Sequence, residues 1–206
     1  MPSDKERQKW DQYYASHHQV DEPENIRQFR DEFVGVVQSL LPEGGGLLEA
    51  GCGAGEQSLA LAGTGAFDIT LMDFSTQAIK LARQCFASRG LDAQFEVQDV
   101  SQPGKPEYDL VFNAGVLEHY SFDEQVDFLR GMASRSHNFV LVLVPNYHNY
   151  WYWLWRIQKS GQGGWPFGKE IPALDLAPVF DAAGLHYLGS AYLGASWTES
   201  FIGGMD

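Results

Sequence analysis

Hydrophobic positions along the chain follow two alternating patterns, one with helical spacing and one of short, continuously apolar runs. Between positions 26 and 40, apolar residues recur at intervals of three and four, which predicts an amphipathic helix; they are Ile26, Phe29, Phe33, Val36, Val37 and Leu40. Residues 47–50 form a short apolar run, which predicts a first strand, and a helix is expected over 57–62.

The same alternation continues to the middle of the chain. Ser75 is a typical N-cap residue and Gly90 a typical helix stop, so a helix is predicted over 76–88. Further strands are predicted at 67–72, 95–97, 108–112 and 139–144, and further helices at 122–133 and 174–183. Strands that alternate with helices in this order lie parallel and are joined by right-handed crossovers.

This order predicts a fold class and the place where function resides. Continuously apolar strands fit a sheet that helices cover on both faces, and 206 residues with 44% hydrophobic content suffice for one core but not for two. We therefore expect a single domain over 1–206 with a Rossmann-like, doubly wound α/β fold and a mostly parallel sheet. Ligands of such sheets bind beyond the carboxyl ends of the strands, so functional residues should directly follow the first four strands.

Three glycines follow the first strand at alternate positions: Gly51, Gly53 and Gly55. Glycine permits a tight turn and lets a ligand approach the backbone closely. The free amides of the following helix then point at whatever binds there. Glycine turns are common, so this pattern alone is a weak sign of a nucleotide-like site.

Two aspartates strengthen that interpretation. Asp73 ends the second strand, 18 residues after Gly55, where a carboxylate can accept hydrogen bonds from both hydroxyls of a ribose. Asp99 follows the third strand, where it could accept from an adenine amine while the Val100 amide reaches a ring nitrogen. Taken singly, Asp73 could cap a helix and Asp99 could be a turn residue. Because three strand ends each supply a suitable group, together they predict a pocket for an adenosine-bearing ligand.

These segments resemble the motifs of class I S-adenosylmethionine-dependent methyltransferases that act on small molecules. Residues 47–55 are similar to their motif I, Asp73 to their ribose-binding acid, residues 98–100 to their adenine-contacting position, and residues 108–119 to their fourth-strand segment. The resemblance covers about residues 26–145. It implies a seven-stranded sheet, S-adenosylmethionine as the cofactor and S-adenosylhomocysteine as the product.

The resemblance also implies which residues bind the cofactor. Glu49, the acid of motif I, is expected near the methionine part, and the backbone around residues 113 and 114 near the cofactor's amino group. The set that we expect is Tyr14, Arg27, Glu49, Gly51, Cys52, Gly53, Gly55, Asp73, Phe74, Asp99, Val100, Asn113 and Ala114. Residues 1–25 are expected to fold over the cofactor as a lid, with Tyr14 or Arg27 meeting its carboxylate; a loosely docked helix is the alternative.

Two departures from related patterns matter. A dinucleotide fingerprint would have glycine or alanine after Gly55 for close helix packing, and this chain has Glu56. That favours a methyltransferase over a nicotinamide-dependent reductase. At the other end of the chain, residues 185–193 are expected to form the sixth strand, and little sequence is left for the seventh. Either residues 196–202 form it or the chain stops short of it.

Methyl transfer from a sulfonium needs an aligned acceptor and the exclusion of water. His119, just after the fourth strand, is the candidate general base, with Glu118 beside it, because neutral imidazole titrates in the useful range. The alternative is that His119 caps the next helix or closes the pocket wall. One Glu and one His are too few ligands for a metal, and Gly115 stands where some related enzymes have a further acid, so no metal is predicted.

An aromatic and glycine-rich insertion, residues 146–170, follows the fifth strand. Within it, Tyr147, Tyr150, Trp151 and Trp155 are expected to form the wall of the acceptor site, because aromatic rings stack on planar or sugar-like molecules. Their spacing also fits helical core packing, and contact with a lipid or a partner is a further alternative.

Composition narrows the partners. The chain has 27 acidic and 14 basic residues, a formal net charge of −13, which disfavours nucleic acid and anionic membranes as partners. We therefore expect a small-molecule acceptor. There are only two cysteines, and no signal-like or membrane-spanning segment is recognised, which favours a cytoplasmic location. Two alternatives stay open: an NAD-dependent reductase on a similar sheet, and a module that binds S-adenosylmethionine without turnover. The oligomeric state is not indicated.

Overall fold

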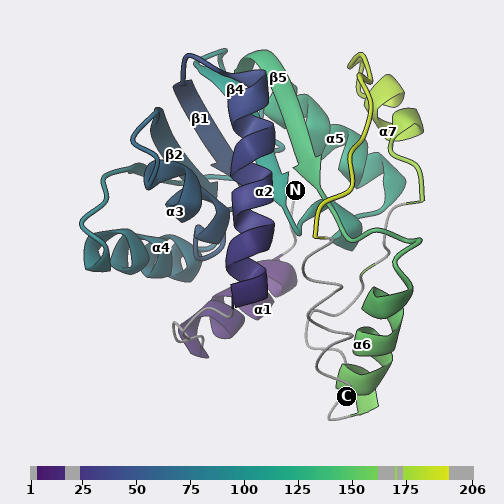
Figure 1. Cartoon of the computed structure of the whole chain (residues 1–206). Coiled ribbons are helices and arrows are strands. Elements are labelled where there is room, and N and C mark those ends of the chain that lie inside the picture. Colours follow the sequence, from purple (N-terminus) through teal and green to yellow (C-terminus); the bar gives the residue numbers. More distant parts are fainter. Residues whose placement is uncertain (1–3, 17–23, 162–169, 171–173, 195–206) are drawn as a thin grey trace.

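The computed structural model describes residues 4–16, 24–161, 170 and 174–194. Within them, five strands form one parallel sheet in the order β3-β2-β1-β4-β5 (Figure 1). The strands are β1 (Gly45–Ala50), β2 (Phe67–Asp73), β3 (Gln94–Val97), β4 (Tyr108–Ala114) and β5 (Ser136–Leu143). The strand order reverses between β1 and β4, and sheets of this kind bind ligands at the carboxyl ends of those strands.

The same residues contain α-helices and one short 3₁₀ helix, η1 (Leu117–His119). The α-helices are α1 (Asp4–Ser16), α2 (Glu24–Leu40), α3 (Glu56–Ala62), α4 (Thr76–Ser88), α5 (Phe122–Ala133), α6 (Tyr150–Gly161) and α7 (Ala177–Ala182). None of the helices in the described ranges combines the length and the apolar character needed to cross a bilayer.

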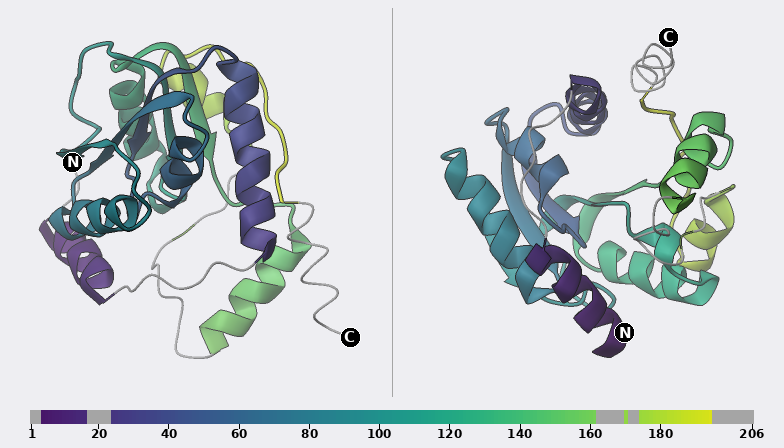
Figure 2. Two further views of the ribbon diagram at one scale, coloured as in Figure 1. Left: turned by 60° about the vertical axis from the view of Figure 1, so that its left-hand side comes forward. Right: turned by 90° about the horizontal axis from the view of Figure 1, so that it is seen from below.

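Helices cover both faces of the sheet (Figure 2). Helices α2, α3 and α4 pack on one face, and their core includes Phe33 and Phe86. Helices α5 and α7 pack on the other face, where Leu129 is fully buried. Neighbouring residues of β1 serve opposite cores, because strand side chains alternate: Leu47 joins the first and Leu48 the second. The predicted doubly wound α/β class is confirmed.

Side-chain caps explain why two helices begin where the sequence predicts. The Ala78 amide donates a hydrogen bond to Ser75 Oγ at 3.1 Å, which starts α4. At the start of α5, the Ser121 amide donates to Glu124 Oε2 at 2.8 Å, one half of a capping box. The predicted bounds 76–88 and 122–133 are confirmed.

Helix α1 lies beside α4 near the carboxyl ends of the strands (Figure 1). Its Asp11 carboxylate accepts a hydrogen bond from Ser75 Oγ. Arg7 Nη2 lies 3.8 Å from Asp99 Oδ2, so α1 is also tied to the segment after β3. These contacts place α1 over the end of the sheet where ligands bind.

The prediction of a sixth strand at 185–193 is wrong. These residues have no regular secondary structure, and no described strand pairs with them. A strand needs a neighbour for its backbone hydrogen bonds, whereas this segment leaves Leu188 and Tyr192 exposed and ends against α2, where the Gly194 amide donates to Glu32 Oε2 at 2.7 Å. The described sheet therefore has five strands rather than seven. Residues 196–202, expected as the seventh strand, lie outside the described residues.

Candidate active site

A cavity of about 340 Å³, here called the first cavity, lies at the carboxyl ends of β1, β2 and β4 and is covered by α1. Nine of the predicted residues line it: Tyr14, Glu49, Gly51, Cys52, Gly53, Asp73, Phe74, Ala114 and His119. Residues expected at different strand ends therefore come together around one cavity. Volumes of this size fall within the range of about 300–1,000 Å³ that is usual for small-molecule sites.

The glycine turn forms one wall of the first cavity. Gly51, Gly53 and Gly55 have φ angles of 70°, 54° and 75°, in the left-handed region that only glycine adopts at little cost. A Cβ atom at Gly51 would lie 2.9 Å from Val116, and one at Gly53 would collide with the Tyr14 hydroxyl. The absence of side chains therefore lets Val116 and Tyr14 pack directly against the turn, whose residues Gly51 and Gly53 line the cavity.

Asp73 holds the glycine turn in place. Its carboxylate accepts hydrogen bonds from the Gly53 amide at 3.0 Å and from the Ser75 amide at 2.8 Å, and the side chain is buried. Burial raises the pKa of Asp73 to about 6. The residue predicted to bind a ribose thus also joins the ends of β1 and β2.

Glu49 lies at the floor of the same cavity and is also buried. Its Oε2 accepts a hydrogen bond from the Ser58 amide at 3.3 Å. Burial raises the pKa of Glu49 to about 8. Two buried carboxyl groups therefore face one cavity, an arrangement that favours a ligand with hydrogen-bond donors or positive charge.

Aromatic residues of α1 close the first cavity from the outside. The Trp10 ring stacks on Tyr14 with centroids 6.0 Å apart and meets His119 edge-on at 5.5 Å. Burial strongly raises the pKa of the Tyr14 phenol. The predicted lid is thus represented by a helix that packs on the site, and its Trp10 reaches the end of β4.

Five of the predicted cofactor residues do not line the first cavity: Arg27, Gly55, Asp99, Val100 and Asn113. Asp99 is bound to the backbone amide of Ser101 at 3.0 Å and paired with Arg7. Asn113 is fully buried, with its Nδ2 3.3 Å from the sulfur of Met132.

A second cavity of about 500 Å³ adjoins the first. Gln57, Ala114 and Gly115 line both cavities. Sequence reasoning missed Gln57. Its position two residues after Gly55, in the first turn of α3, would have indicated that its side chain points toward the strand ends.

The second cavity is lined partly by the predicted insertion, but not by the aromatic residues that were expected. Tyr147 and Tyr150 are exposed and do not line it, whereas His148 and Tyr152 do. Tyr147 and Tyr150 therefore face solvent and not the second cavity. The side chains of Trp151 and Trp155 lie outside the described residues.

The two candidate catalytic residues lie on different cavities. His119 lines the first cavity and Glu118 the second. Glu118 is 4% exposed, and its Oε2 accepts no hydrogen bond from the described residues. Burial, with a smaller contribution from Glu170, raises the pKa of Glu118 to about 8. Among the residues that the structure describes, no group of three His, Cys, Asp or Glu side chains could hold a metal ion.

Residues 47–136 match the family model of a methyltransferase domain. The matched segment runs from β1 into β5 and therefore contains the glycine turn, Asp73, Glu118 and His119. No relative is found among curated proteins.

Several solved structures have a similar fold. A protein studied for the conversion of a disulfide bond into a thioacetal group during echinomycin biosynthesis is 26% identical, with a TM-score of 0.59 over 71% of this chain and 65% of its own. The cyclase SpnF is 26% identical, with a TM-score of 0.58 over 77% and 58%. The magnesium protoporphyrin IX methyltransferase of Synechocystis PCC 6803, crystallised with bound S-adenosylhomocysteine, is 23% identical, with a TM-score of 0.59 over 86% and 83%. The chain thus spans less than two thirds of the first two proteins.

The independent observations agree. The family model covers the segment with the glycine turn, Glu49 and Asp73 of the first cavity and with Glu118 of the second, the similar structures share the fold, and the glycine turn and buried acids lie at the carboxyl ends of β1 and β2. Residues 47–136 thus match a methyltransferase domain, and the described residues share the fold of a solved methyltransferase that was crystallised with S-adenosylhomocysteine.

Proposed function

We propose that this chain transfers a methyl group from S-adenosylmethionine to a small molecule. The observation that carries the proposal is that the two cavities meet at Gln57, Ala114 and Gly115. The first has the glycine turn and buried acids, and the second has a largely apolar wall. Reacting atoms held on either side of the shared residues would be close enough for direct transfer.

The described residues of the first cavity fit the cofactor. Asp73 would hold the ribose and Glu49 the methionine end, while the turn at Gly51 and Gly53 lets the ligand lie against the backbone. When bound, the cofactor supplies an activated methyl group on a positively charged sulfur. The Asp73 carboxyl group, with a pKa of about 6, is ionised at neutral pH and complements that positive charge.

Helix α1 would exclude water from the site. Trp10 and Tyr14 cover the glycine turn, and His119 packs against Trp10. This packing favours the role of His119 as part of the cavity wall over its predicted role as general base. An acceptor in the second cavity would meet Glu118 instead, and Glu118 is the better candidate to receive a proton.

The proposal also covers the class of acceptor, the domain organisation and the cellular location. The second cavity has the volume of a small-molecule site. The net charge of −13 disfavours nucleic acid as the acceptor. We propose a single domain that acts on small molecules in the cytoplasm.

Two other functions make different predictions. A nicotinamide-dependent reductase would bind NAD, and Glu56 stands where close helix packing would need a small residue. A module without turnover would bind S-adenosylmethionine and leave its methyl group in place, and an enzyme with another chemistry, as the cyclase SpnF has, would transfer no methyl group.

A labelled-methyl assay separates these functions. The chain is incubated with S-adenosylmethionine that carries an isotopically labelled methyl group and a panel of amines, phenols and thiols. We expect the label in one acceptor class and an equal amount of S-adenosylhomocysteine. Binding of the cofactor without label transfer to any acceptor would contradict methyl transfer, and binding of NAD in its place would support the reductase.

A further inference from the structure

We propose that the second cavity binds an apolar small molecule that carries a basic amine, and that Glu118 and Gln57 hold the amine beside the first cavity. This inference rests on the proposed methyltransferase function, because it names the chemical class of the acceptor. Four features of the cavity support it: two acceptor oxygens without donors, the charge of the lining, its apolar remainder and the position of Glu118.

Two oxygen atoms at the junction have no hydrogen-bond donor among the described residues. Glu118 Oε2 and Gln57 Oε1 are both buried, and neither accepts a hydrogen bond. Buried polar atoms are normally paired, so such atoms in a cavity indicate a ligand that supplies what is missing. Gln57 Oε1 is an acceptor, and both oxygens of Glu118 are acceptors once its carboxyl group is ionised, so the ligand that complements both is a donor with positive charge. An ammonium group has three donors and no acceptor.

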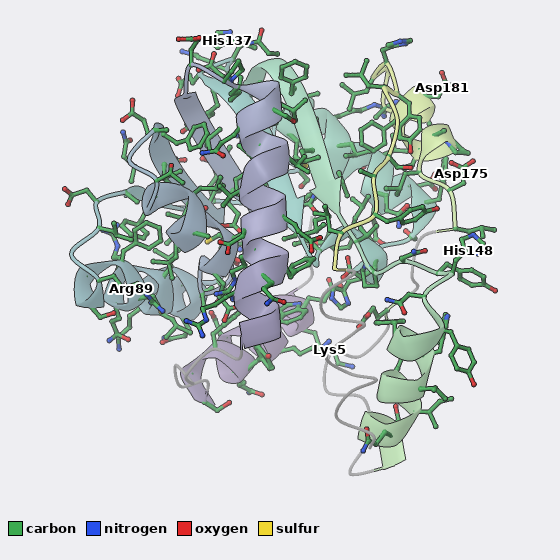
Figure 3. The ribbon with its side chains drawn as sticks, in the orientation of Figure 1. Lys5, Arg89, His137, His148, Asp175 and Asp181 are labelled. Atoms are coloured by element: carbon green, nitrogen blue, oxygen red, sulfur yellow. The ribbon has the colours of Figure 1, made fainter. Side chains whose placement is uncertain are left out.

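The charge of the lining points to a cation. Glu118 and Asp175 contribute carboxyl groups, and the described lining contains neither lysine nor arginine. Figure 3 shows Asp175 and His148 on the side of the molecule that carries α6 and α7, between these two helices. The guanidinium of Arg156 is not part of the lining and is bound to the Tyr152 hydroxyl at 3.1 Å and to the Glu170 carbonyl at 2.9 Å. For an anionic ligand, the described lining offers only the His148 imidazole as a group that can carry positive charge.

The rest of the lining fits an apolar body. Six aliphatic side chains contribute to it: Val142, Leu143, Val144, Leu174, Leu176 and Leu193. They come from the end of β5 and from the segments before and after α7. A ligand with one polar end and a hydrocarbon or aromatic body would therefore match the cavity as a whole.

Glu118 lies at the junction where the two cavities meet. A Cβ atom at Gly115, which lines both cavities, would be 3.7 Å from Glu118 Oε1. An amine bound to this carboxyl group is thus held beside the first cavity.

If the amine binds as proposed, its binding should release a proton to solvent. Burial raises the pKa of Glu118 to about 8, so in the empty cavity at neutral pH the carboxyl group keeps its proton, and a free alkylamine carries its extra proton as well. The complex needs only one of these two protons, shared between nitrogen and carboxylate, and the other is released to solvent. For transfer, this shared proton passes to Glu118, the nitrogen lone pair forms the new N–C bond, and the electrons of the broken C–S bond stay on sulfur.

Calorimetry with three matched probes tests the proposal. The full chain with S-adenosylhomocysteine is titrated with 2-phenylethylamine, 2-phenylethanol and 3-phenylpropanoate, in two buffers of different ionisation enthalpy. We expect the amine to bind at least about tenfold more tightly than the alcohol and the carboxylate, with the release of about one proton. Glu118→Gln should lose both the preference and the proton release. Glu107→Gln, an exposed glutamate at the other end of β4, should keep both.

Equal affinity for amine and alcohol, tighter binding of the carboxylate, or no amine binding at millimolar concentration would overturn the proposal. Should Glu118→Gln not fold, Asp175→Asn at the exposed rim provides the test, with an expected loss of about threefold in amine preference. A wild-type chain that does not bind S-adenosylhomocysteine would refute the proposed function itself. Binding of S-adenosylhomocysteine without preference for the amine would refute only this inference.

Discussion

The first and second cavities share Gln57, Ala114 and Gly115, but their buried carboxyl groups differ in the hydrogen bonds that they accept. Asp73 accepts hydrogen bonds from two backbone amides and so fixes the shape of the glycine turn. Glu118 Oε2 accepts none from the described residues. Two backbone donors fix the Asp73 carboxyl group beside the turn, whereas Glu118 Oε2 lacks a donor that a ligand could supply. The backbone of the glycine turn therefore shapes the first cavity, and we propose that side chains such as Glu118 determine which ligand the second cavity binds.

The largest effect on cofactor binding is expected from a side chain added to the glycine turn. Gly53→Ala would place a Cβ atom against the Tyr14 hydroxyl, in a backbone conformation with φ of 54°. We expect the affinity for S-adenosylhomocysteine to fall by about a hundredfold or more, measured by calorimetry. Gly65→Ala is the matched control, because φ there is 70° and nothing lies within 4 Å. If both variants lost affinity equally, backbone strain rather than close approach would explain the effect.

The second-largest effect on cofactor binding is expected from removing the Asp73 carboxyl group, which holds the glycine turn in place. Asp73→Ala removes acceptors for two amides and for a ribose, and should weaken cofactor binding by about 1.5–3 kcal/mol. Asp109→Ala is a useful control, because Asp109 also accepts from a glycine amide, that of Gly46 at 2.9 Å, but at the opposite end of the sheet. That variant should lose stability and keep its cofactor affinity. Unchanged affinity in Asp73→Ala would remove the ribose role.

The pH dependence of the free energy of unfolding tests the buried state of Glu118 in the second cavity. Burial raises the pKa of Glu118 from 4.5 to about 8, so between these values the folded protein holds a proton that the unfolded chain has released. The free energy of unfolding contributed by Glu118 therefore falls as pH rises through this range.

Glu118→Gln removes this contribution. From pH 5 to pH 9 the variant should gain stability relative to wild type by about 4 kcal/mol, because about three pH units lie between pH 5 and the pKa of about 8; urea denaturation measures this difference. The raised pKa values of Glu49 and Asp73 act equally in both proteins and cancel in the difference. Parallel pH profiles of the two proteins would show that Glu118 is not a buried, protonated group.

The smallest effect is expected from the helix that covers the first cavity. Trp10→Ala removes the stacking on Tyr14 and the edge contact with His119, contacts worth about 0.5–1.5 kcal/mol. Cofactor affinity should fall several-fold, and the affinity of the second cavity for an amine should stay the same. Trp10→Phe should restore most of the loss. A drop in amine affinity alone would contradict the assignment of α1 to the first cavity.

The first cavity could be predicted from the sequence because local signals build it. The glycine turn and the Ser75 cap each act within a few residues along the chain, and Asp73 meets Gly53 across two neighbouring strands, so residue type and spacing are enough to place them. The helix over 76–88 was predicted to the residue because its cap is local.

The second cavity could not be predicted in the same way. It depends on contacts between distant segments, such as residues 142–146, 174–176 and 187–193. The aromatic pattern after β5 suggested Tyr147 and Tyr150 as its wall, and the structure leaves both exposed. The prediction of a sixth strand is wrong for a related reason. A strand needs a neighbouring strand for its backbone hydrogen bonds, and no local sequence pattern shows whether that neighbour is present.

The central claim is that the first cavity binds S-adenosylmethionine, and a calorimetric titration of the purified chain with this compound and with S-adenosylhomocysteine tests it most directly. We predict micromolar binding of both at one site per chain, lost in Gly53→Ala and kept in Gly65→Ala. A folded wild-type chain that binds neither compound would contradict the account.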